Sequence, residues 1–252
     1  MGDLSDPLYQ DPDLVEFYDI ENGAWDDFGF CREIARDARS VLDLGCGTGQ
    51  LAAMIANGRR VVGVDPAGAM LDIARTRTGG DKVRWIEASA QTVRLNETFD
   101  LVLLTGHAFQ VFLTDDDARA VLETIAAHLA PNGTFIFDSR NPGRKEWREW
   151  TPAKSGRMVM HPLHGAVKAW NDVAFDEKTA IATYQTFYEF QASGKTVSAS
   201  SQIRFIGKER LAELIAEAGL RVDRWLGDWQ GGAYAPNSRE IIPIGRLRLP
   251  SA

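Results

Sequence analysis

A glycine-rich segment is the strongest chemical signal in the sequence. It reads DLGCGTG from Asp43 to Gly49, with glycines at alternate positions. Alternate glycines let the backbone turn sharply and lie closer to a ligand than a Cβ atom would permit. A helix that begins directly behind such a turn offers unpaired N–H groups and a partial positive charge. The segment therefore predicts a binding site for a ligand that is partly anionic or rich in hydrogen-bond acceptors.

An acidic residue follows the glycine segment at the end of the next apolar run. Asp65 ends VVGVD, 20 residues after Gly45. A carboxylate at the end of the second strand of an α/β unit can accept hydrogen bonds from both hydroxyls of a ribose. In the purely structural alternative, the glycines only form a tight turn and Asp65 only caps the next helix.

Two classes of ligand use such an arrangement. Dinucleotides favour the pattern GxGxxG, with the pyrophosphate at the helix N-terminus. Gly45 and Gly47 fit this pattern, but Gln50 stands where its third glycine belongs. The sequence has instead an acidic residue, Asp43, two positions before GxGxG.

With this motif and those after it, the sequence resembles the class I S-adenosylmethionine-dependent methyltransferases. The likeness covers about residues 41–138 and, more loosely, 207–248. The similar segments are VLDLGCGTG (41–49) for the first motif of the family, VVGVDPAGAMLDIAR (61–75) for the second, and FDLVLLTGHAFQVF (99–112) with HLAPNGTFIFD (128–138) for the fourth and fifth strands.

The resemblance implies S-adenosylmethionine as the cofactor, S-adenosylhomocysteine as the product, and no metal. The first two motifs would hold the methionine part and the ribose, with Asp43 on the amino group, Asp65 on the ribose, and Gly45, Cys46, Gly47 and Gly49 beneath the methionine. The later positions would be Pro66, Met70, Ser89 and Ala90 at the adenine, and Thr105 and His107 beside the sulfonium. The family often has Asp where Ser89 stands, so backbone groups are expected to bond the adenine amino group.

The elements that must position these residues alternate between strand and helix. From Val41 to Asp138, short β-branched runs that are almost continuously apolar alternate with helical patterns. Such strands, each followed by a crossover helix, form a parallel sheet that is covered on both faces. The sequence predicts a doubly wound, Rossmann-like α/β fold. The resemblance implies a mostly parallel sheet of seven strands.

The rest of the chain is expected to flank and interrupt this core. Residues 1–40 are predicted as an N-terminal helical segment, 41–138 and 207–252 as the α/β core, and 139–206 as an inserted β subdomain that acts as a lid or as a substrate or subunit contact. Within the insertion, residues 167–205 predict three antiparallel strands joined by turns. Pro243 in the last strand predicts a bulge or an early end of pairing, because proline cannot donate to a ladder.

The acceptor is expected beyond the carboxyl ends of the strands, where open α/β sheets bind their ligands. Methyl transfer from a sulfonium is an in-line displacement, for which the protein supplies alignment, exclusion of water and, where needed, removal of a proton. His107 is the candidate catalytic base, since histidine exchanges protons near neutral pH. The alternative is that His107 packs on the cofactor or bonds a backbone carbonyl. The expected acceptor contacts are Tyr18, Phe109, Arg140 and Tyr188.

Aromatic residues crowd the insertion and could form a wall of the acceptor pocket. Alternation in TYQTFYEF places Tyr184 and Tyr188 on one face of a strand and Phe187 on the other. One face of the small sheet is expected to form its core. Trp25, in the N-terminal segment, is a further candidate for the acceptor pocket.

Composition excludes several classes of function. With 28 Lys and Arg against 35 Asp and Glu, the net charge is -7, and no global field would gather nucleic acid or anionic lipid. No apolar run approaches the roughly 18 residues that span a bilayer. Cys31 and Cys46 form no CxxC pair and are expected to be free thiols in a cytoplasmic protein. His161 and His164 lack a helix and a third ligand, so no metal site is predicted there.

The sequence therefore favours a methyltransferase that acts on a small molecule, either an amine, a hydroxyl or a carboxylate. An NAD(P)-dependent oxidoreductase and a non-catalytic S-adenosylmethionine-binding module are the alternatives. A homodimer through the strand edges of the insertion is a further expectation, because free edges can pair. The sequence does not specify the acceptor or the methylated atom.

Overall fold

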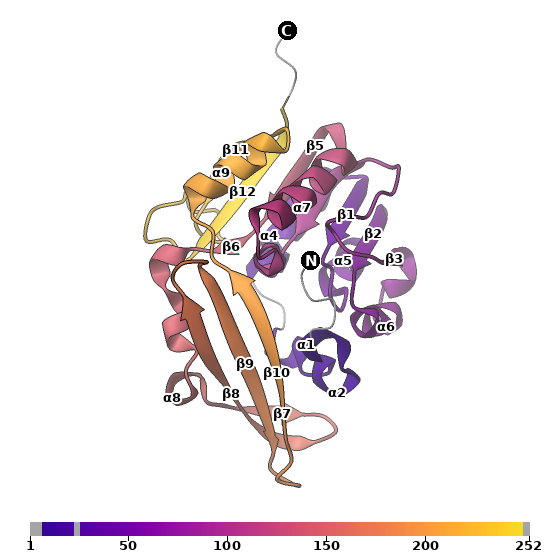
Figure 1. Ribbon diagram of the computed structural model, residues 1–252. Coiled ribbons are helices and arrows are strands. Elements are labelled where there is room, and N and C mark those ends of the chain that lie inside the picture. Colours follow the sequence, from indigo (N-terminus) through magenta and orange to yellow (C-terminus); the bar gives the residue numbers. More distant parts are fainter. Residues whose placement is uncertain (1–6, 23–25, 249–252) are drawn as a thin grey trace.

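The computed structural model describes residues 7–22 and 26–248 and contains two sheets (Figure 1). The larger sheet runs in the order β11–β12–β5–β4–β1–β2–β3, with the short β6 paired to β12. Its strands are β1 (Ser40–Leu44), β2 (Arg60–Asp65), β3 (Val83–Glu87), β4 (Phe99–Leu104), β5 (Leu129–Phe137), β6 (Ser139–Arg140), β11 (Leu220–Leu226) and β12 (Glu240–Leu247). Strands β1 to β5 are parallel, and β12 is antiparallel to its neighbours. The predicted doubly wound, mostly parallel fold is confirmed.

Helices cover both faces of this sheet. Successive side chains of a strand point to opposite faces, so each apolar strand contributes to two cores. On one face, Leu42 and Val102 belong to a core shared with α7 (Asp115–His128) and α9 (Lys208–Glu217). On the other face, Val41 and Leu101 belong to a core shared with α4 (Asp26–Ile34) and α5 (Gln50–Ile55). Helix α6 (Gly68–Thr76) follows β2 and contacts β3.

Local sequence explains where these helices begin and end. The Thr114 hydroxyl accepts the backbone N–H of Asp117 at 3.1 Å and caps α7, whose first turn carries three aspartates. Acidic residues there compensate the positive end of the helix dipole. Helix α9 ends just before Gly219, which has a φ of 76°. This is the left-handed position that glycine commonly takes after a helix.

The insertion forms a separate antiparallel sheet of four strands in the order β10–β9–β8–β7. The strands are β7 (Arg157–His161), β8 (Gly165–Asp176), β9 (Ile181–Phe190) and β10 (Thr196–Arg204). The prediction of three strands missed β7. This strand is only five residues long, and pairing with β8 across the turn at 162–164 defines it. Two 3₁₀ turns and a short helix lie between the core and β7. They are η4 (Pro142–Arg144), η5 (Glu146–Glu149) and α8 (Pro152–Ser155).

Three short helices at the N-terminus connect the two sheets. They are α1 (Pro7–Gln10), α2 (Pro12–Val15) and α3 (Tyr18–Glu21). Helix α1 contacts both α6 of the core and β10 of the inserted sheet, and α3 contacts β7 (Figure 1). The N-terminal segment therefore spans the space between the core and the insertion.

Pro243 interrupts the pairing of β12 on one side. Strand β12 pairs with β6 at Glu240 and Ile241 and with β5 only from Ile244 onward. On its other side the neighbouring strand β11 carries an irregularity between Val222 and Arg224. The expected bulge or early end of pairing at Pro243 is not found: the register is the same before and after it, and only a gap lies opposite the junction of β5 and β6.

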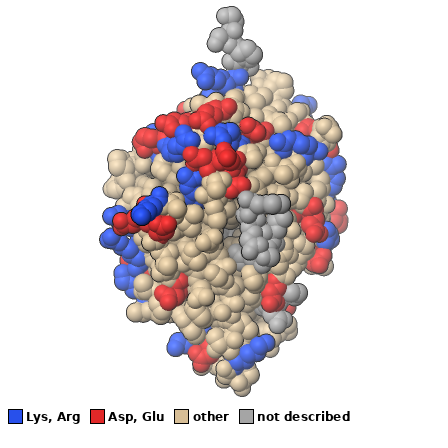
Figure 2. Space-filling model, viewed as in Figure 1, with Lys and Arg blue, Asp and Glu red and all other residues tan. Residues whose placement is uncertain are grey.

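Charged side chains of opposite sign are mixed on the surface of α7, α9 and β10 (Figure 2). Asp115 pairs with both Arg204 and Arg210 at 2.7 Å, and Arg119 pairs with Glu217 at 3.0 Å. Basic groups on this face are thus neutralised by acidic neighbours. Within the described part of the chain, no helix combines the length and apolar character needed to cross a membrane.

Candidate active site

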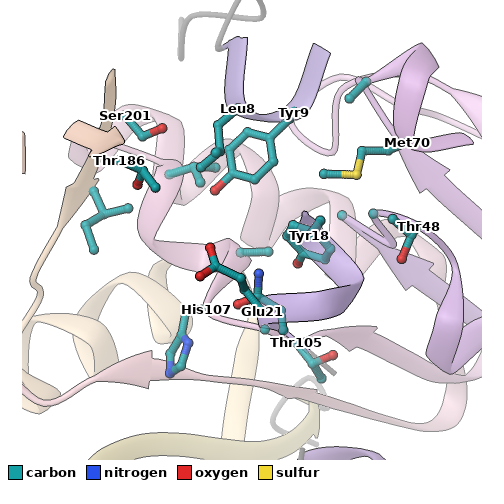
Figure 3. A pocket seen from close by; sticks show the side chains of 18 of the residues that line it. Leu8, Tyr9, Tyr18, Glu21, Thr48, Met70, Thr105, His107, Thr186 and Ser201 are labelled. Atoms are coloured by element: carbon teal, nitrogen blue, oxygen red, sulfur yellow. The ribbon is translucent and has the colours of Figure 1, made fainter. Parts of the chain in front are cut away.

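A large cavity lies at the carboxyl ends of the parallel strands, between the core, the N-terminal helices and the inserted sheet (Figure 3). Its volume is about 1400 Å³. Pockets for a single drug-sized ligand are usually roughly 300–1,000 Å³. Parallel strands end at a common edge, so residues that directly follow β1, β2 and β4 meet there although they are far apart in sequence. The cavity has room for two molecules side by side.

The glycine segment forms one wall of this cavity. Gly45 and Gly47 border it, with φ values of 64° and 52° that side chains rarely adopt. Gly49 does not border the cavity. A Cβ atom on Gly49 would lie 2.3 Å from the Trp85 ring and 2.8 Å from the Cβ atom of Ala74. The third glycine therefore serves the close packing of the loop on β3 and α6.

Two buried carboxylates stand beside the glycine loop. Asp65 accepts the backbone N–H groups of Gly47 and Ala67, each at 2.8 Å, and both of its oxygens are thereby oriented. Asp43 is 3% exposed. Burial, followed by the negative charges of Asp65 and Asp27, raises the pKa of Asp43 to about 8. Burial also raises the pKa of Asp65, against the opposing effect of its two backbone hydrogen bonds.

The other positions that the resemblance assigns to the cofactor lie around the same part of the cavity. Ser89 shares hydrogen bonds with Gln91, whose backbone N–H donates to the Ser89 hydroxyl at 3.3 Å. Gln91 borders the cavity too. The assigned residues found at the cavity are Asp43, Gly45, Cys46, Gly47, Asp65, Pro66, Met70, Ser89, Ala90, Thr105 and His107.

His107 lies between the carboxylates of Glu240, in β12, and Asp138, which separates β5 from β6. Its Nε2 atom is 3.0 Å from Oε2 of Glu240 and 3.4 Å from Oδ2 of Asp138. Its backbone N–H donates to Oδ1 of Asp138 at 3.0 Å. Burial raises the pKa of Asp138, which the nearby His107 only partly opposes. Burial acts in the same sense on Glu240, but the hydrogen bond and charge of His107 outweigh it and hold the pKa of Glu240 below its usual range.

These groups define an acidic end of the cavity. Asp27, from α4, borders the cavity and is 4% exposed. Burial, followed by the negative charge of Asp138, raises the pKa of Asp27 to about 6. Arg140 is nearby, but its guanidinium donates to Gln110 at 2.9 Å, lies 3.6 Å from Glu146 and is over the Trp150 ring. Arg140 is therefore held by protein groups, although its buried Nε atom has no hydrogen-bond partner among the described residues.

Helix α3 forms the roof of the cavity and is tied to both sides of it. The Tyr18 ring lies 3.7 Å from the position of a Cβ atom on Gly47. Glu21 accepts the Tyr188 hydroxyl at 2.5 Å and pairs with Arg157, both in the inserted sheet. Figure 3 shows Tyr18 and Glu21 projecting from this helix. Burial, followed by the charge of Asp65, raises the pKa of Tyr18, so its hydroxyl stays protonated.

On its other side, α3 holds the glycine loop. The Thr48 hydroxyl donates to Asp19 at 2.6 Å, and Arg77 pairs with the same carboxylate. Arg77 also donates from Nε to the backbone carbonyl of Thr48 at 2.9 Å. One aspartate of α3 thus links the roof, the loop and the end of α6.

Phe109 differs from its expected role. It is 0% exposed and stacks on Phe137, with Phe112 edge-on. The backbone takes a left-handed conformation at His107, with φ 61°, and then enters the 3₁₀ turn Ala108–Val111 (η3). This turn carries Phe109 into the core instead of the cavity. The expectation that Phe109 contacts an acceptor is therefore wrong, and its ring instead supports the turn from the core.

Among the remaining aromatic residues, the predicted alternation in β9 is confirmed. Tyr184 and Tyr188 border the cavity, whereas Phe187 stacks on Trp170. Trp25 lies outside the described residues.

Five acidic residues that border the cavity were not considered as site residues from sequence. They are Glu21, Asp27, Glu146, Asp228 and Glu240. Glu240 is 133 residues from His107 and meets it because β12 returns antiparallel beside β6, where Glu240 pairs in register with Arg140. No local pattern distinguishes these carboxylates from the other acidic residues. The only available signal for Glu240 was its position at the start of the last strand of the sheet.

A cluster of two histidines and a glutamate lies apart from the His107 site, at the turn between β7 and β8. Glu16, His161 and His164 bring ligand-type atoms within 4.8 Å of one another. The backbone N–H of Leu163 donates to Nδ1 of His161 at 3.2 Å, while Nε2 is 3.3 Å from Glu16. A neutral ring that accepts at Nδ1 carries its proton on Nε2. His161 is thereby suited to donate a hydrogen bond to Glu16.

Comparison with protein families finds a methyltransferase domain within the chain. Residues 41–133 match the family model described as "Methyltransferase domain". The match covers β1 to β4 and includes the glycine loop, Asp65 and His107 at the cavity.

Two relatives match over nearly their whole length. The cypemycin N-terminal methyltransferase of Streptomyces sp is 28% identical over 260 residues, covering 96% of this chain and 98% of the relative. The trans-aconitate 2-methyltransferase of Azoarcus sp. (strain BH72) is 28% identical over 258 residues, covering 96% and 97%.

Solved structures share the fold, including the insertion. The CcbJ methyltransferase from Streptomyces caelestis superposes with a TM-score of 0.80 at 20% identity, over 98% of this chain and all of that one. CalS10, an amino pentose methyltransferase from Micromonospora echinaspora solved with S-adenosylmethionine bound, gives a TM-score of 0.68 at 23% identity, over 90% and 93%.

Proposed function

This chain is a class I S-adenosylmethionine-dependent methyltransferase, and we propose that it transfers the methyl group to the amine nitrogen of a small molecule. The observation that supports an amine most strongly is the set of carboxylates around His107. Asp27, Asp138 and Glu240 come together at the acceptor end of the cavity, each 5% exposed or less. The repulsion among them decreases when a cation enters, and an ammonium group is such a cation.

The residues of the glycine side fit the cofactor. Gly45 and Gly47 leave a surface without Cβ atoms, Asp43 and Asp65 present carboxylates to an ammonium and to ribose hydroxyls, and Met70 offers an apolar contact. When bound, S-adenosylmethionine supplies a methyl group that is already activated by the sulfonium charge. The protein's task is then to align the nucleophile, exclude water and accept a proton.

His107 is placed to accept that proton. A carboxylate only accepts hydrogen bonds. In the neutral imidazole, the contact of Nε2 with Glu240 at 3.0 Å therefore assigns the ring proton to Nε2 and leaves Nδ1 as the basic atom. An ammonium must lose a proton before its nitrogen can attack, and Nδ1 of His107 takes it. Asp138 and Glu240 stabilise the imidazolium that results.

A carboxylate acceptor is the second candidate, since one full-length relative is a trans-aconitate methyltransferase. A carboxylate would need a cationic partner, and the three arginines that border the cavity already face carboxylates. Arg140 and Arg239 face Glu146, and Arg157 pairs with Glu21. The acidic end therefore favours the amine. The family match gives no support to a nicotinamide-dependent oxidoreductase.

The test is an acceptor screen that measures S-adenosylhomocysteine formed from a panel of primary amines and a panel of carboxylates. We expect turnover of amines. His107→Gln should lower kcat by roughly 10²- to 10⁴-fold without weakening cofactor binding, and Glu240→Gln should lower it in the same way. His164→Gln, at an exposed histidine, is the matched control. Turnover of carboxylates alone, or an unchanged kcat in His107→Gln, would contradict the proposal.

Two further points remain part of the proposal. A cytoplasmic location agrees with the two free thiols, Cys31 and Cys46, and cell fractionation tests it. A homodimer through the insertion requires a free strand edge, and β7 and β10 are the outer strands of the inserted sheet. Sedimentation over a range of protein concentrations tests it.

A further inference from the structure

The inserted sheet presents a strip of uncharged polar side chains to the cavity. Asn171, Tyr184, Thr186 and Ser201 all border it. The strands bring them together, since Asn171 pairs in register with Thr186, and Tyr184 with Ser201. Figure 3 shows Thr186 and Ser201 at the cavity, near Leu8 and Tyr9.

The same face of the sheet is apolar on both sides of this strip. On one side, Val159, Val167 and Ala199 pack with α2 and Phe17. On the other, Ala182 and Ile203 pack with the two tryptophans of the segment before β7. Thr186 and Ser201 are each 4% exposed. Burial of polar side chains is unfavourable compared with burial of apolar ones, so their position on the cavity-facing part of an otherwise apolar face indicates a role toward a ligand.

The hydrogen bonds within the strip leave Thr186 able to donate. Arg157 donates to Oδ1 of Asn171 at 2.9 Å, and Nδ2 of Asn171 donates to the Thr186 hydroxyl at 2.9 Å. Among the described residues, the Thr186 hydroxyl accepts this bond and donates none to another residue. The charge of Arg157 is neutralised by Glu21. The strip thus offers hydroxyl and amide groups without net charge.

We propose that this strip, defined by Asn171, Tyr184, Thr186 and Ser201, binds an uncharged body rich in hydrogen-bonding groups, to which the acceptor amine is attached. The inference rests on the proposed amine methyl transfer, and it adds the chemistry of the rest of the acceptor. The amine lies at the acidic end beside His107, and hydroxyls or amides of the body bond to the inserted sheet. Specificity arises because an apolar body would offer no acceptor to the donor of the Thr186 hydroxyl.

The experiment compares three primary amines as acceptors, namely D-glucosamine, alanyl-alanine amide and cyclohexylamine. The first carries hydroxyls, the second carries amides, and the third carries neither. For each, kcat/KM is measured from S-adenosylhomocysteine formation, and the affinity is measured separately by calorimetry with S-adenosylhomocysteine present. We expect the wild type to prefer at least one of the first two over cyclohexylamine by tenfold or more.

The variants Thr186→Val and Tyr184→Phe each remove one hydroxyl with little change of shape. Each should reduce the preference about three- to tenfold, through the preferred amine and not through cyclohexylamine. Thr196→Val is the control, because Thr196 is exposed in β10 and does not border the cavity. A loss of general stability would lower activity toward all three amines equally, so the ratio reports on recognition. Tyr184→Phe keeps the test decisive if Thr186→Val does not fold.

The outcomes separate this inference from the proposed function. Equal use of all three amines, or a preference that neither variant changes, overturns the inference while amine methylation stands. If no amine is methylated but glucosamine or the dipeptide amide binds more tightly than cyclohexylamine, and Thr186→Val removes that difference, the strip is upheld and amine transfer is not. A preference for glucosamine would show that the strip bonds to hydroxyls of the acceptor, and a preference for alanyl-alanine amide would show that it bonds to amides.

Discussion

Asp43 carries a carboxyl group whose protonation should change when a cation binds beside it. Burial and the neighbouring carboxylates raise its pKa to about 8. At pH 7 most Asp43 side chains are therefore protonated in the free protein. The cofactor carries an ammonium and a sulfonium, and a nearby positive charge favours the ionised carboxylate.

Binding of S-adenosylmethionine at pH 7 should accordingly release close to one proton, and affinity should fall as the pH decreases below about 8. Calorimetry in two buffers with different ionisation enthalpies measures the release. Asp43→Asn should abolish most of it, whereas Asp72→Asn, an exposed residue of α6 paired with Arg75, should not. Proton release that persists in Asp43→Asn would assign the titration to another group, such as Asp65.

Helix α3 is the element that joins the cofactor side to the acceptor side. Asp19 holds Thr48 and Arg77 of the core, and Glu21 holds Arg157 and Tyr188 of the insertion. The helix has only four residues, so it is too short to be stable on its own, and these tertiary bonds must maintain it.

Loss of one anchor should loosen the roof of the cavity. Asp19→Asn removes the charge that Arg77 pairs with, at a site where both side chains are one-third exposed or less. We expect faster hydrogen exchange in residues 7–22 and dissociation of S-adenosylhomocysteine about three- to tenfold faster, as for the net loss of one ordinary hydrogen bond. Glu33→Gln breaks an exposed ion pair between Glu33 of α4 and Arg36 and should change neither quantity. Unchanged exchange in Asp19→Asn would show that α3 is held by packing alone.

For the whole molecule, the acidic cavity couples stability to pH. The pKa values of Asp27 and Asp43 in the folded protein, about 6 and about 8, exceed their ordinary value of 3.8. The folded state then binds more protons than the unfolded state, so the free energy of unfolding decreases as pH rises. This stabilisation is complete below about pH 4 and is lost as pH increases through about 6 and then 8. Carboxylates with lowered pKa values, such as Asp115 and Glu240, act in the opposite sense at low pH.

Urea unfolding of the cofactor-free protein should therefore show stability decreasing between about pH 4 and pH 8. Asp43→Asn should flatten this slope across the whole of that range, and Asp27→Asn only between about pH 4 and 6. Saturation with S-adenosylmethionine should flatten it as well, since the bound cation favours ionised carboxylates. A free energy of unfolding that increases across this range would refute the raised pKa values.

Much of the core could be predicted from sequence because its determinants are local. Apolar runs such as VVGVD specify strands by the residues they contain, and alternation of strands with helical patterns specifies a parallel sheet. The glycine loop and Asp65 directly follow their strands, so a parallel sheet brings them to one edge. Their place at the cavity follows from chain order and sheet geometry alone.

The acceptor end could not be predicted in this way, because its residues meet only through the tertiary structure. Glu240 reaches His107 across 133 residues, and Glu21 reaches Tyr188 across 167. The left-handed conformation at His107 and the 3₁₀ turn after it place His107 at the cavity and Phe109, two residues later, in the core. The sequence by itself determined a sheet with a cofactor loop at its edge, since those patterns are set by neighbouring residues. Only the tertiary structure decided which carboxylates surround the base and which face of the insertion meets the cavity, since those contacts depend on how β12, α3 and the inserted sheet close over the core.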